Sequence, residues 1–223
     1  MKKLIFLISL LYWIFLFHCA TEQKAISPAY TPQEKCDGPA WNVGNTWRYR
    51  YSDMKEWQYT VERIEGNLYI IEDRYGPDKP CFDKKNLEMV AYINLDGKKV
   101  KLRAPSIFYI DFPIYEGKKW KKMVSGTPLR GATEINYLNE FQVISYEDVN
   151  VPAGTFKAFK IELKQTNYGG QFATGKVYLW YSPEVKFYIK VVFDKIPYWI
   201  GTLDSILISY NLKKEESPPS EIK

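Results

Sequence analysis

Histidine is almost absent from this chain, because His18 is the single one among 223 residues. A domain without histidine cannot hold a serine–histidine or cysteine–histidine catalytic pair. Cysteine is scarce as well, and Cys19, Cys36 and Cys81 cannot complete a four-ligand zinc shell. Gly169-Gly170 is typical of a turn and not of a phosphate-binding loop. We therefore expect a protein that is not an enzyme and needs no metal or other cofactor.

Carboxylates could still support catalysis, because a glycosidase needs only two of them at a set distance. Acidic residues on strands usually face solvent, and no spacing distinguishes a pair among the candidates. These candidates are Glu72, Asp73, Asp111, Glu140, Asp194 and Asp204.

The first 18 residues have the pattern of an export signal. Lys2 and Lys3 precede an apolar run from Leu4 to Phe17 that only Ser9 interrupts. This run is short for a membrane-spanning helix, which needs about 20 residues, and suits a signal-peptide core. An uncleaved membrane anchor is the alternative interpretation.

Leu16-Phe17-His18-Cys19 resembles the lipobox of bacterial lipoproteins, in which the cysteine after the cleaved bond carries the lipid. His18 stands where that pattern has a small residue, so a soluble secreted protein cut near Ala20 stays an alternative. The resemblance implies a protein of the bacterial cell envelope, anchored to a membrane through lipidated Cys19. Ala20 is not the aspartate associated with inner-membrane retention, which favours the outer membrane, on its periplasmic or surface side, where two membranes exist.

The charge of the mature chain is too small to indicate nucleic acid as a partner. Without Lys2 and Lys3, 29 basic residues remain against 26 acidic ones, a net charge of +3. Nucleic-acid-binding domains usually carry a strongly basic patch, and export makes such a partner still less expected.

Cys36 and Cys81 are the two cysteines left after Cys19. In an oxidising envelope we expect them to form a disulfide, which would hold the segment before Trp41 against the domain. Two free thiols are the alternative.

The composition divides the chain into four parts. Residues 1–18 are the predicted signal peptide, 19–40 the lipidated cysteine and a proline-containing tether, 41–212 one domain, and 213–223 a charged, proline-rich tail predicted to be disordered.

Apolar and polar side chains alternate with a period of two through residues 41–212, which is typical of half-exposed antiparallel strands. Trp47, Tyr49 and Tyr51 alternate with arginines, and Asp96-Gly97 separates two such runs as a hairpin turn would. Gly131–Leu138 is the only weak helix candidate. We predict an all-β domain with little helix, built as a single curled antiparallel sheet, a half-barrel or barrel-like meander of roughly ten strands. A sandwich stays open as an alternative, because a large twisted sheet curls, splits or closes.

Four segments resemble a group of uncharacterised bacterial envelope lipoproteins of unknown function. They are Val43–Trp47, Pro113–Trp120, Val149–Ile161 and Trp180–Lys190. That group is similar to the LolA/LolB-like lipoprotein-carrier fold, a curved antiparallel sheet around an apolar cavity. The resemblance implies no catalytic residue. Carriers of that fold close the half-barrel with helices, and this sequence has no good candidate for one.

Two local features suggest that the domain could bind lipid. Lys118-Lys119-Trp120-Lys121-Lys122 could contact anionic headgroups, although lysines that protect a sheet edge explain it more simply. The mature chain has 32 aromatic residues, many at alternating positions typical of a core, and some could instead line a concavity for an acyl chain. Our candidates for that lining are Trp47, Tyr49, Trp57, Tyr59 and Tyr181.

The first functional hypothesis is therefore a non-enzymatic envelope lipoprotein whose β domain binds a hydrophobic or lipidic ligand. The second is a structural or assembly factor that engages another envelope protein without a small-molecule pocket.

Overall fold

The computed structural model describes residues 34–74, 76–102, 108–126, 135–168, 175–194 and 203–214. The chain forms two compact units, Met1–Pro32 and Gln33–Lys223, and the first lies outside the described residues. The predicted signal peptide, Cys19, most of the tether and the end of the predicted tail also lie outside them. Everything below concerns the second unit.

The described residues form twelve strands and no helix, so the all-β prediction is confirmed and the count exceeds the expected ten. Residues 131–134 of the weak helix candidate lie outside the described part, and Ile135–Leu138 begin a strand. The strands are β1 (Thr46–Tyr51), β2 (Glu56–Glu65), β3 (Leu68–Asp73), β4 (Lys79–Asp83), β5 (Met89–Ile93), β6 (Lys99–Lys101), β7 (Lys119–Gly126), β8 (Ile135–Val151), β9 (Gly154–Tyr168), β10 (Gly175–Ser182), β11 (Phe187–Asp194) and β12 (Ser205–Asn211).

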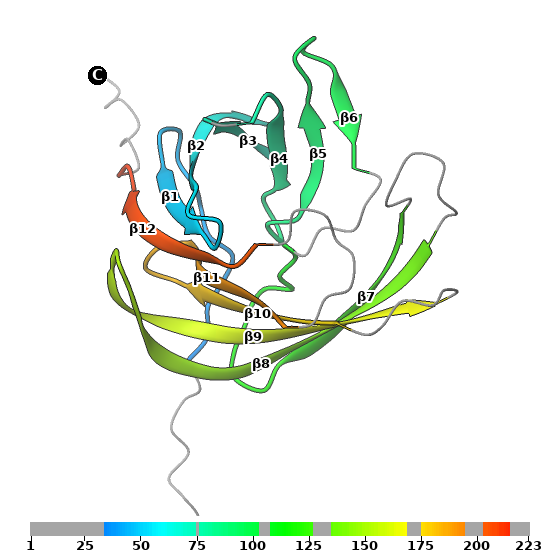
Figure 1. Ribbon diagram of the computed structural model, residues 1–223, viewed down its shortest axis with the longest axis vertical. Helices are drawn as coiled ribbons and strands as arrows, with labels where there is room; N and C mark the ends of the chain where they lie inside the picture. Colours follow the sequence, from blue (N-terminus) through cyan, green and yellow to red (C-terminus); the bar gives the residue numbers. More distant parts are fainter. Residues whose placement is uncertain are drawn as a thin grey trace, which may run out of the picture. The chain divides into compact units, whose positions relative to one another are not determined.

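All twelve strands belong to one antiparallel sheet with the order β6-β5-β4-β3-β2-β1-β12-β11-β10-β9-β8-β7. The chain therefore makes two meanders: β1 to β6 runs from the middle of the sheet to one edge, and β7 to β12 runs from the other edge back to the middle, where β12 pairs with β1 (Figure 1). The connection from β6 to β7 must pass from one edge of the sheet to the other. The single curled sheet expected from the sequence is the observed architecture.

Bulges bend this sheet at several places along its width. Register shifts fall between Arg48 and Tyr49, Val61 and Arg63, Val143 and Ser145, and Trp180 and Tyr181. Each bulge increases the local twist and bends its strand. A twelve-stranded sheet with such bends curls and acquires a concave face.

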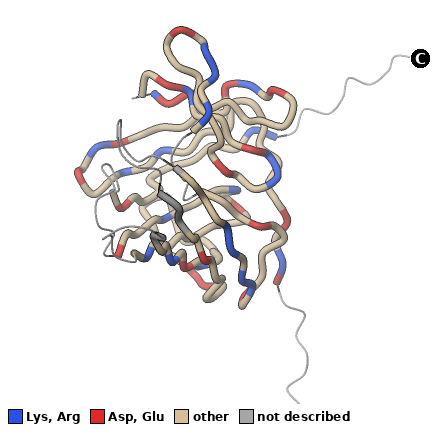
Figure 2. Tube along the Cα trace, turned by 90° about the vertical axis from the view of Figure 1, so that its right-hand side faces the viewer, with Lys and Arg blue, Asp and Glu red and all other residues tan. Residues whose placement is uncertain are grey.

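The main core covers the concave face, as the alternation predicts. Trp47 and Tyr49 are buried while Arg48 between them is exposed. On β9, Phe159, Ile161 and Leu163 are fully buried in the same core. Charges of both signs are interspersed along the outside of the chain (Figure 2).

The predicted bridge between Cys36 and Cys81 does not form, because both cysteines are free and buried. Cys36 belongs to the main core. Cys81 packs on the opposite face, in a separate cluster with Ile70 and Ile93. Phe82 belongs to the main core, and successive side chains of a strand point to opposite faces, so Cys81 points away from Cys36.

Residues 108–118, which we call the strap, pack over the concave face between the two edges of the sheet. Ile110 and Ile114 are fully buried in the main core. The Ile110 N–H donates to the Asn86 carbonyl at 2.8 Å, and Ile114 exchanges two main-chain hydrogen bonds of 2.9 Å with Cys36. The strap thus covers part of the concave face of the sheet. Among the residues that the structure describes, no helix is long and apolar enough to cross a membrane.

Candidate functional site

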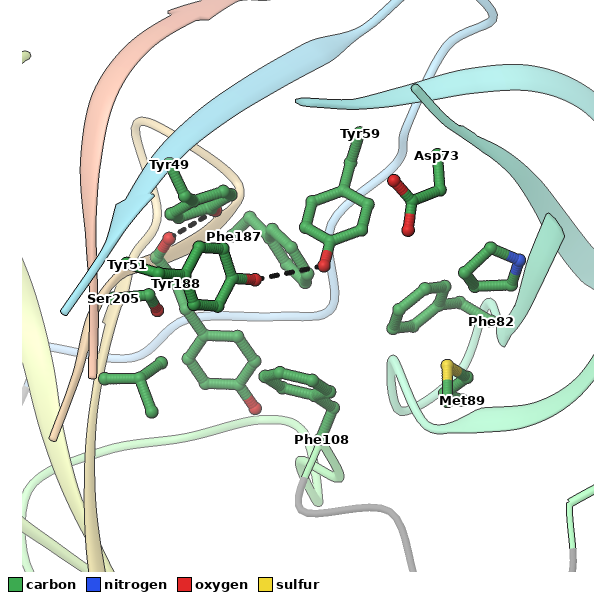
Figure 3. Close-up of a pocket in the computed structure, with 12 residues that line it drawn as sticks. Tyr49, Tyr51, Tyr59, Asp73, Phe82, Met89, Phe108, Phe187, Tyr188 and Ser205 are labelled. Carbon is green, nitrogen blue, oxygen red and sulfur yellow. Dashed lines mark hydrogen bonds between the residues drawn. The ribbon is translucent and has the colours of Figure 1, made fainter. Parts of the chain in front are cut away.

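The concave side of the sheet contains a partly enclosed cavity of about 250 Å³. Typical small-molecule sites have volumes of about 300 Å³ or more, so this smaller cavity suits one acyl chain or a small apolar group. Strands from both meanders and the strap supply its walls (Figure 3). The lining residues are Tyr49, Tyr51, Tyr59, Asp73, Pro80, Phe82, Met89, Phe108, Phe187, Tyr188, Val191 and Ser205.

Strand register explains why residues distant in sequence meet here. Tyr49 and Tyr51 are two residues apart on β1, so both point to the concave face. Tyr59 on β2 is the direct partner of Asp73 on β3. Side chains directly opposite each other on antiparallel strands lie about 5 Å apart at Cβ, which places the Asp73 carboxylate beside the Tyr59 ring.

The phenol groups of the cavity make specific hydrogen bonds. The Tyr49 hydroxyl donates to the Tyr188 carbonyl at 2.6 Å, and the hydroxyls of Tyr51 and Tyr59 pair at 3.1 Å (Figure 3). The Tyr188 hydroxyl is buried and has no hydrogen-bond partner among the described residues. A buried polar atom without a partner is rare in proteins and costs about 1–3 kcal/mol, so this hydroxyl is a candidate contact for a ligand or water.

Burial keeps these phenols neutral. Desolvation raises the pKa of Tyr49 and of Tyr59 well above the ordinary value of 10.0, and it also raises the pKa of Tyr51 and of Tyr188. The rings therefore offer apolar faces and un-ionised hydroxyls at any physiological pH.

Phe187 lies at the centre of the aromatic cluster around the cavity. Its ring centroid is 5.0 Å from Trp41, 6.1 Å from Phe82 and 6.3 Å from both Tyr49 and Phe108. The Phe108 ring also packs 5.4 Å from Tyr188. The strap therefore contributes one aromatic wall of the cavity.

Two of the five aromatic residues proposed from the sequence, Tyr49 and Tyr59, line this cavity. Trp47 is fully buried in the core and donates its indole N–H to the Val185 carbonyl at 2.9 Å. Tyr181 is buried beneath the strap, 5.5 Å from Phe112. Trp57 is half-buried beside Tyr51, with ring centroids 5.9 Å apart. A period of two identifies a face of a strand but not the place along the strand where the cavity opens.

Sequence reasoning missed Tyr188 because the alternation of apolar Phe187 and Ile189 assigns Tyr188 between them to the solvent-exposed face of β11. A bulge on β11, opposite Trp180 and Tyr181 of β10, interrupts the alternation of side chains on that strand. As a result Phe187, Tyr188 and Ile189 are all buried. Phe108 was missed because it lies in a connection without any period.

The turn between β10 and β11 binds two tryptophan side chains from the start of the domain. The indole N–H of Trp41 donates to the Lys186 carbonyl at 2.8 Å, and that of Trp47 to the Val185 carbonyl. This turn thus holds the segment that leads from the tether into the domain.

The carboxylates considered for catalysis are dispersed. Asp111 pairs with Lys118, Glu140 pairs with Lys121, and Asp204 accepts the Phe193 N–H. Of the six, Asp73 is the one that lines the cavity. The described residues contain no group of three or more histidine, cysteine or acidic side chains that could hold a metal ion.

The lysine-rich segment 118–122 is largely part of edge strand β7. Trp120 is buried and stacks on Phe141 with centroids 5.0 Å apart, so it does not stand at a lipid interface. Lys118, Lys121 and Lys122 all have acidic partners. These contacts favour the simpler interpretation of a protected sheet edge.

Fold and cavity together define an all-β protein with one curled, strap-covered sheet and an aromatic cavity on its concave side. No family model and no curated protein matches the sequence. Among solved structures, the chain is similar to a predicted lipoprotein from Parabacteroides distasonis. The sequence identity is 15%, the match covers 80% of this chain and 100% of that chain, and the TM-score is 0.42. It is also similar to the hypothetical lipoprotein YmcC from Escherichia coli, at 10% identity, 77% and 84% coverage and a TM-score of 0.46. A predicted exported protein with a YmcC-like fold from Bacteroides fragilis matches at 12% identity, 79% and 99% coverage and a TM-score of 0.36.

Proposed function

We propose that this chain is a non-enzymatic lipoprotein of the bacterial cell envelope that binds a hydrophobic or lipidic ligand in the aromatic cavity. The cavity is the observation that carries the proposal. Aromatic side chains form most of its walls, and they are the surfaces that a buried apolar group contacts favourably. Its volume indicates a ligand no larger than one acyl chain or one ring system.

The location rests on the N-terminal sequence. The basic start, the short apolar run and Cys19 support export and lipid anchoring, and Ala20 supports retention in the outer membrane where two membranes exist. Trp41 in the core lies 22 positions after Cys19, so an extended tether would let the domain lie at most about 75 Å from a lipid anchor at Cys19.

The alternative is an assembly factor that adds a strand to the sheet of another envelope protein. Both edges of the sheet are strands with one unpaired side, β6 and β7. However, β6 is three residues long and carries Lys99 and Lys101, and β7 carries three lysines. A very short edge strand and a lysine-rich one both resist strand addition, so the edges support this alternative less well than the cavity supports the first.

Binding is tested with the full-length protein in nanodiscs of neutral lipid and the neutral dye N-phenyl-1-naphthylamine, with empty nanodiscs as the blank. We expect saturable fluorescence enhancement. Met89→Trp fills the cavity and should weaken dye binding at least tenfold. Leu95→Trp is the control, since Leu95 is 81% exposed and outside the cavity.

Absence of saturable binding would overturn the ligand proposal. So would unchanged affinity in a Met89→Trp protein whose thermal unfolding matches the wild type. The anchor is tested separately by mass spectrometry of the N-terminal peptide, which should begin at Cys19 and carry acyl chains, and a Cys19→Ser chain should lack this species. A mature chain that begins after Cys19 would refute lipidation.

A further inference from the structure

We propose that the cavity selects an amphiphile with a positively charged head, such as an alkylamine or a quaternary alkylammonium group, over an anionic one. This inference rests on the proposed ligand-binding function and adds the charge of the ligand. It depends on Asp73 and on the aromatic rings around it.

Asp73 is the only charged residue among the described residues that line the cavity. No lysine or arginine is among them, although the whole chain has 31 basic residues. Lys79, the basic residue next to Pro80 on β4, points to the other face and pairs with Glu62. An anionic head would therefore face a carboxylate in a space whose described lining includes no basic side chain, at a cost in desolvation.

The end of the cavity at Asp73 is rich in hydrogen-bond acceptors. Tyr59 stands directly opposite Asp73 in the β2–β3 ladder, and its hydroxyl pairs with that of Tyr51. This pairing uses one phenol proton, and phenol and carboxylate oxygens can each accept more than one hydrogen bond. A primary amine has donors for these acceptors.

Aromatic faces supply the second attraction. A cation over the face of a tyrosine or phenylalanine ring is attracted by the ring quadrupole, and quaternary ammonium groups are commonly bound by several such rings. Tyr59 and Phe82 lie beside Asp73, and Tyr51 lies on the far side of Tyr59 (Figure 3). The rings further inside the cavity, those of Phe108, Phe187 and Tyr188, would contact the apolar chain.

Asp73 also has a structural role, which the test must separate from its charge. One carboxylate oxygen, Oδ1, accepts the Gly76 N–H at 3.2 Å in the turn after β3. Asparagine keeps an oxygen at this position and removes only the charge. Asp73→Asn is therefore the informative variant, and Glu72→Gln is its matched control, because Glu72 is the exposed neighbour on the same strand.

The experiment uses full-length protein in neutral nanodiscs loaded with the neutral dye, and three competitors with the same eight-carbon chain. We expect octyltrimethylammonium to displace the dye at a concentration about tenfold lower than octanoate, with octanol between them. Asp73→Asn should reduce this ratio to about twofold, whereas Glu72→Gln should keep it. Tetramethylammonium, which lacks the chain, should displace the dye at least tenfold less well than octyltrimethylammonium.

Equal displacement by octyltrimethylammonium and octanoate would overturn the inference and leave the ligand-binding proposal intact, since the dye would still bind. An unchanged ratio in Asp73→Asn would also overturn it. Equal competition by tetramethylammonium would overturn the amphiphile and leave a simple cation site. Failure of the dye to bind wild-type protein would instead refute the proposed function itself.

Discussion

The Tyr49 hydroxyl donates a hydrogen bond to the Tyr188 main-chain carbonyl and thereby joins β1 to β11, although β12 lies between these strands in the sheet. Among the residues that the structure describes, the ladder between β11 and β12 has two pairs, Lys190↔Ile206 and Val191↔Ser205. Few main-chain bonds therefore join the half of the sheet from β6 to β12 to the half from β11 to β7, and the buried Tyr49 side chain adds a hydrogen bond between these two halves. Because both tyrosines line the cavity, the wall of the candidate site also holds the two halves of the sheet together.

Tyr49→Phe should lower the free energy of unfolding by about 1–2 kcal/mol, because it removes the bond to the buried Tyr188 carbonyl while keeping the ring. Urea unfolding followed by fluorescence measures this loss. Tyr51→Phe is the control, since Tyr51 is half-buried and bonds only to another hydroxyl. A Tyr49→Phe protein as stable as the wild type would show that the bond between the halves contributes nothing.

Trp41→Ala should lower the free energy of unfolding by about 3–5 kcal/mol, the usual range for a buried large aromatic residue. The Trp41 ring is 2% exposed, packs 4.7 Å from Trp47 and 4.8 Å from Tyr69, and its N–H bonds to the Lys186 carbonyl. Trp57→Ala should cost much less, because Trp57 is half-buried. Thermal unfolding of both variants makes the comparison, and equal losses would contradict the anchoring role of Trp41.

Cys36 and Cys81 should behave as free, protected thiols. Burial raises the pKa of Cys36 to about 11 and also raises the pKa of Cys81, so little reactive thiolate exists at pH 8. In the folded protein both should react with a soluble disulfide reagent much more slowly than after denaturation, when both should be alkylated without prior reduction. Alkylation of both only after reduction would establish the disulfide that the structure does not contain.

Lys122 joins edge strand β7 to the segment before β5 across the concave side. Its ammonium group pairs with Glu88 and lies 4.3 Å from the centre of the Tyr109 ring in the strap. Lys122→Gln should cost about 1 kcal/mol, and a double-mutant cycle with Glu88→Gln should reveal coupling. Lys121→Gln is the matched control, because its pair with Glu140 is exposed and worth little. Equal effects of the two lysine substitutions would contradict a link across the sheet.

Glu147 should contribute to the loss of stability in acid. Hydrogen bonds from the Trp180 indole and then from the Ser145 hydroxyl, with Lys160 and Lys190 nearby, lower its pKa below the ordinary value of 4.5. A carboxyl group with a lowered folded-state pKa stabilises the protein above its unfolded pKa, and this stability is lost as pH falls through the folded value. The decrease in the urea midpoint between pH 7 and pH 3 should therefore be smaller in Glu147→Gln. The exposed control Glu72→Gln should keep the wild-type decrease, and an identical decrease in Glu147→Gln would refute this role.

Much of the fold was predictable because alternation is a local property. A strand with one buried face repeats its apolar residues every second position, so the sequence alone assigns Trp47 and Tyr49, or Phe159 and Ile161, to a core. The same pattern assigns Tyr188 wrongly, because a bulge on its own strand, where Ile189 has no partner on β10, interrupts the alternation. The sequence does not mark the position of that bulge. The cysteine pairing failed for a related reason, since compartment chemistry does not show which face of β4 holds Cys81.

The sequence by itself determined the all-β class, because alternation is local in the chain. It predicted a single curled sheet with a sandwich as the alternative, and its export signal stays a prediction. Only the tertiary structure decided that β1 pairs with β12, that the strap covers the concave face, and that Asp73 stands among aromatic rings. These features depend on contacts between residues far apart in the chain, whose geometry depends on twist and bulges accumulated over many strands.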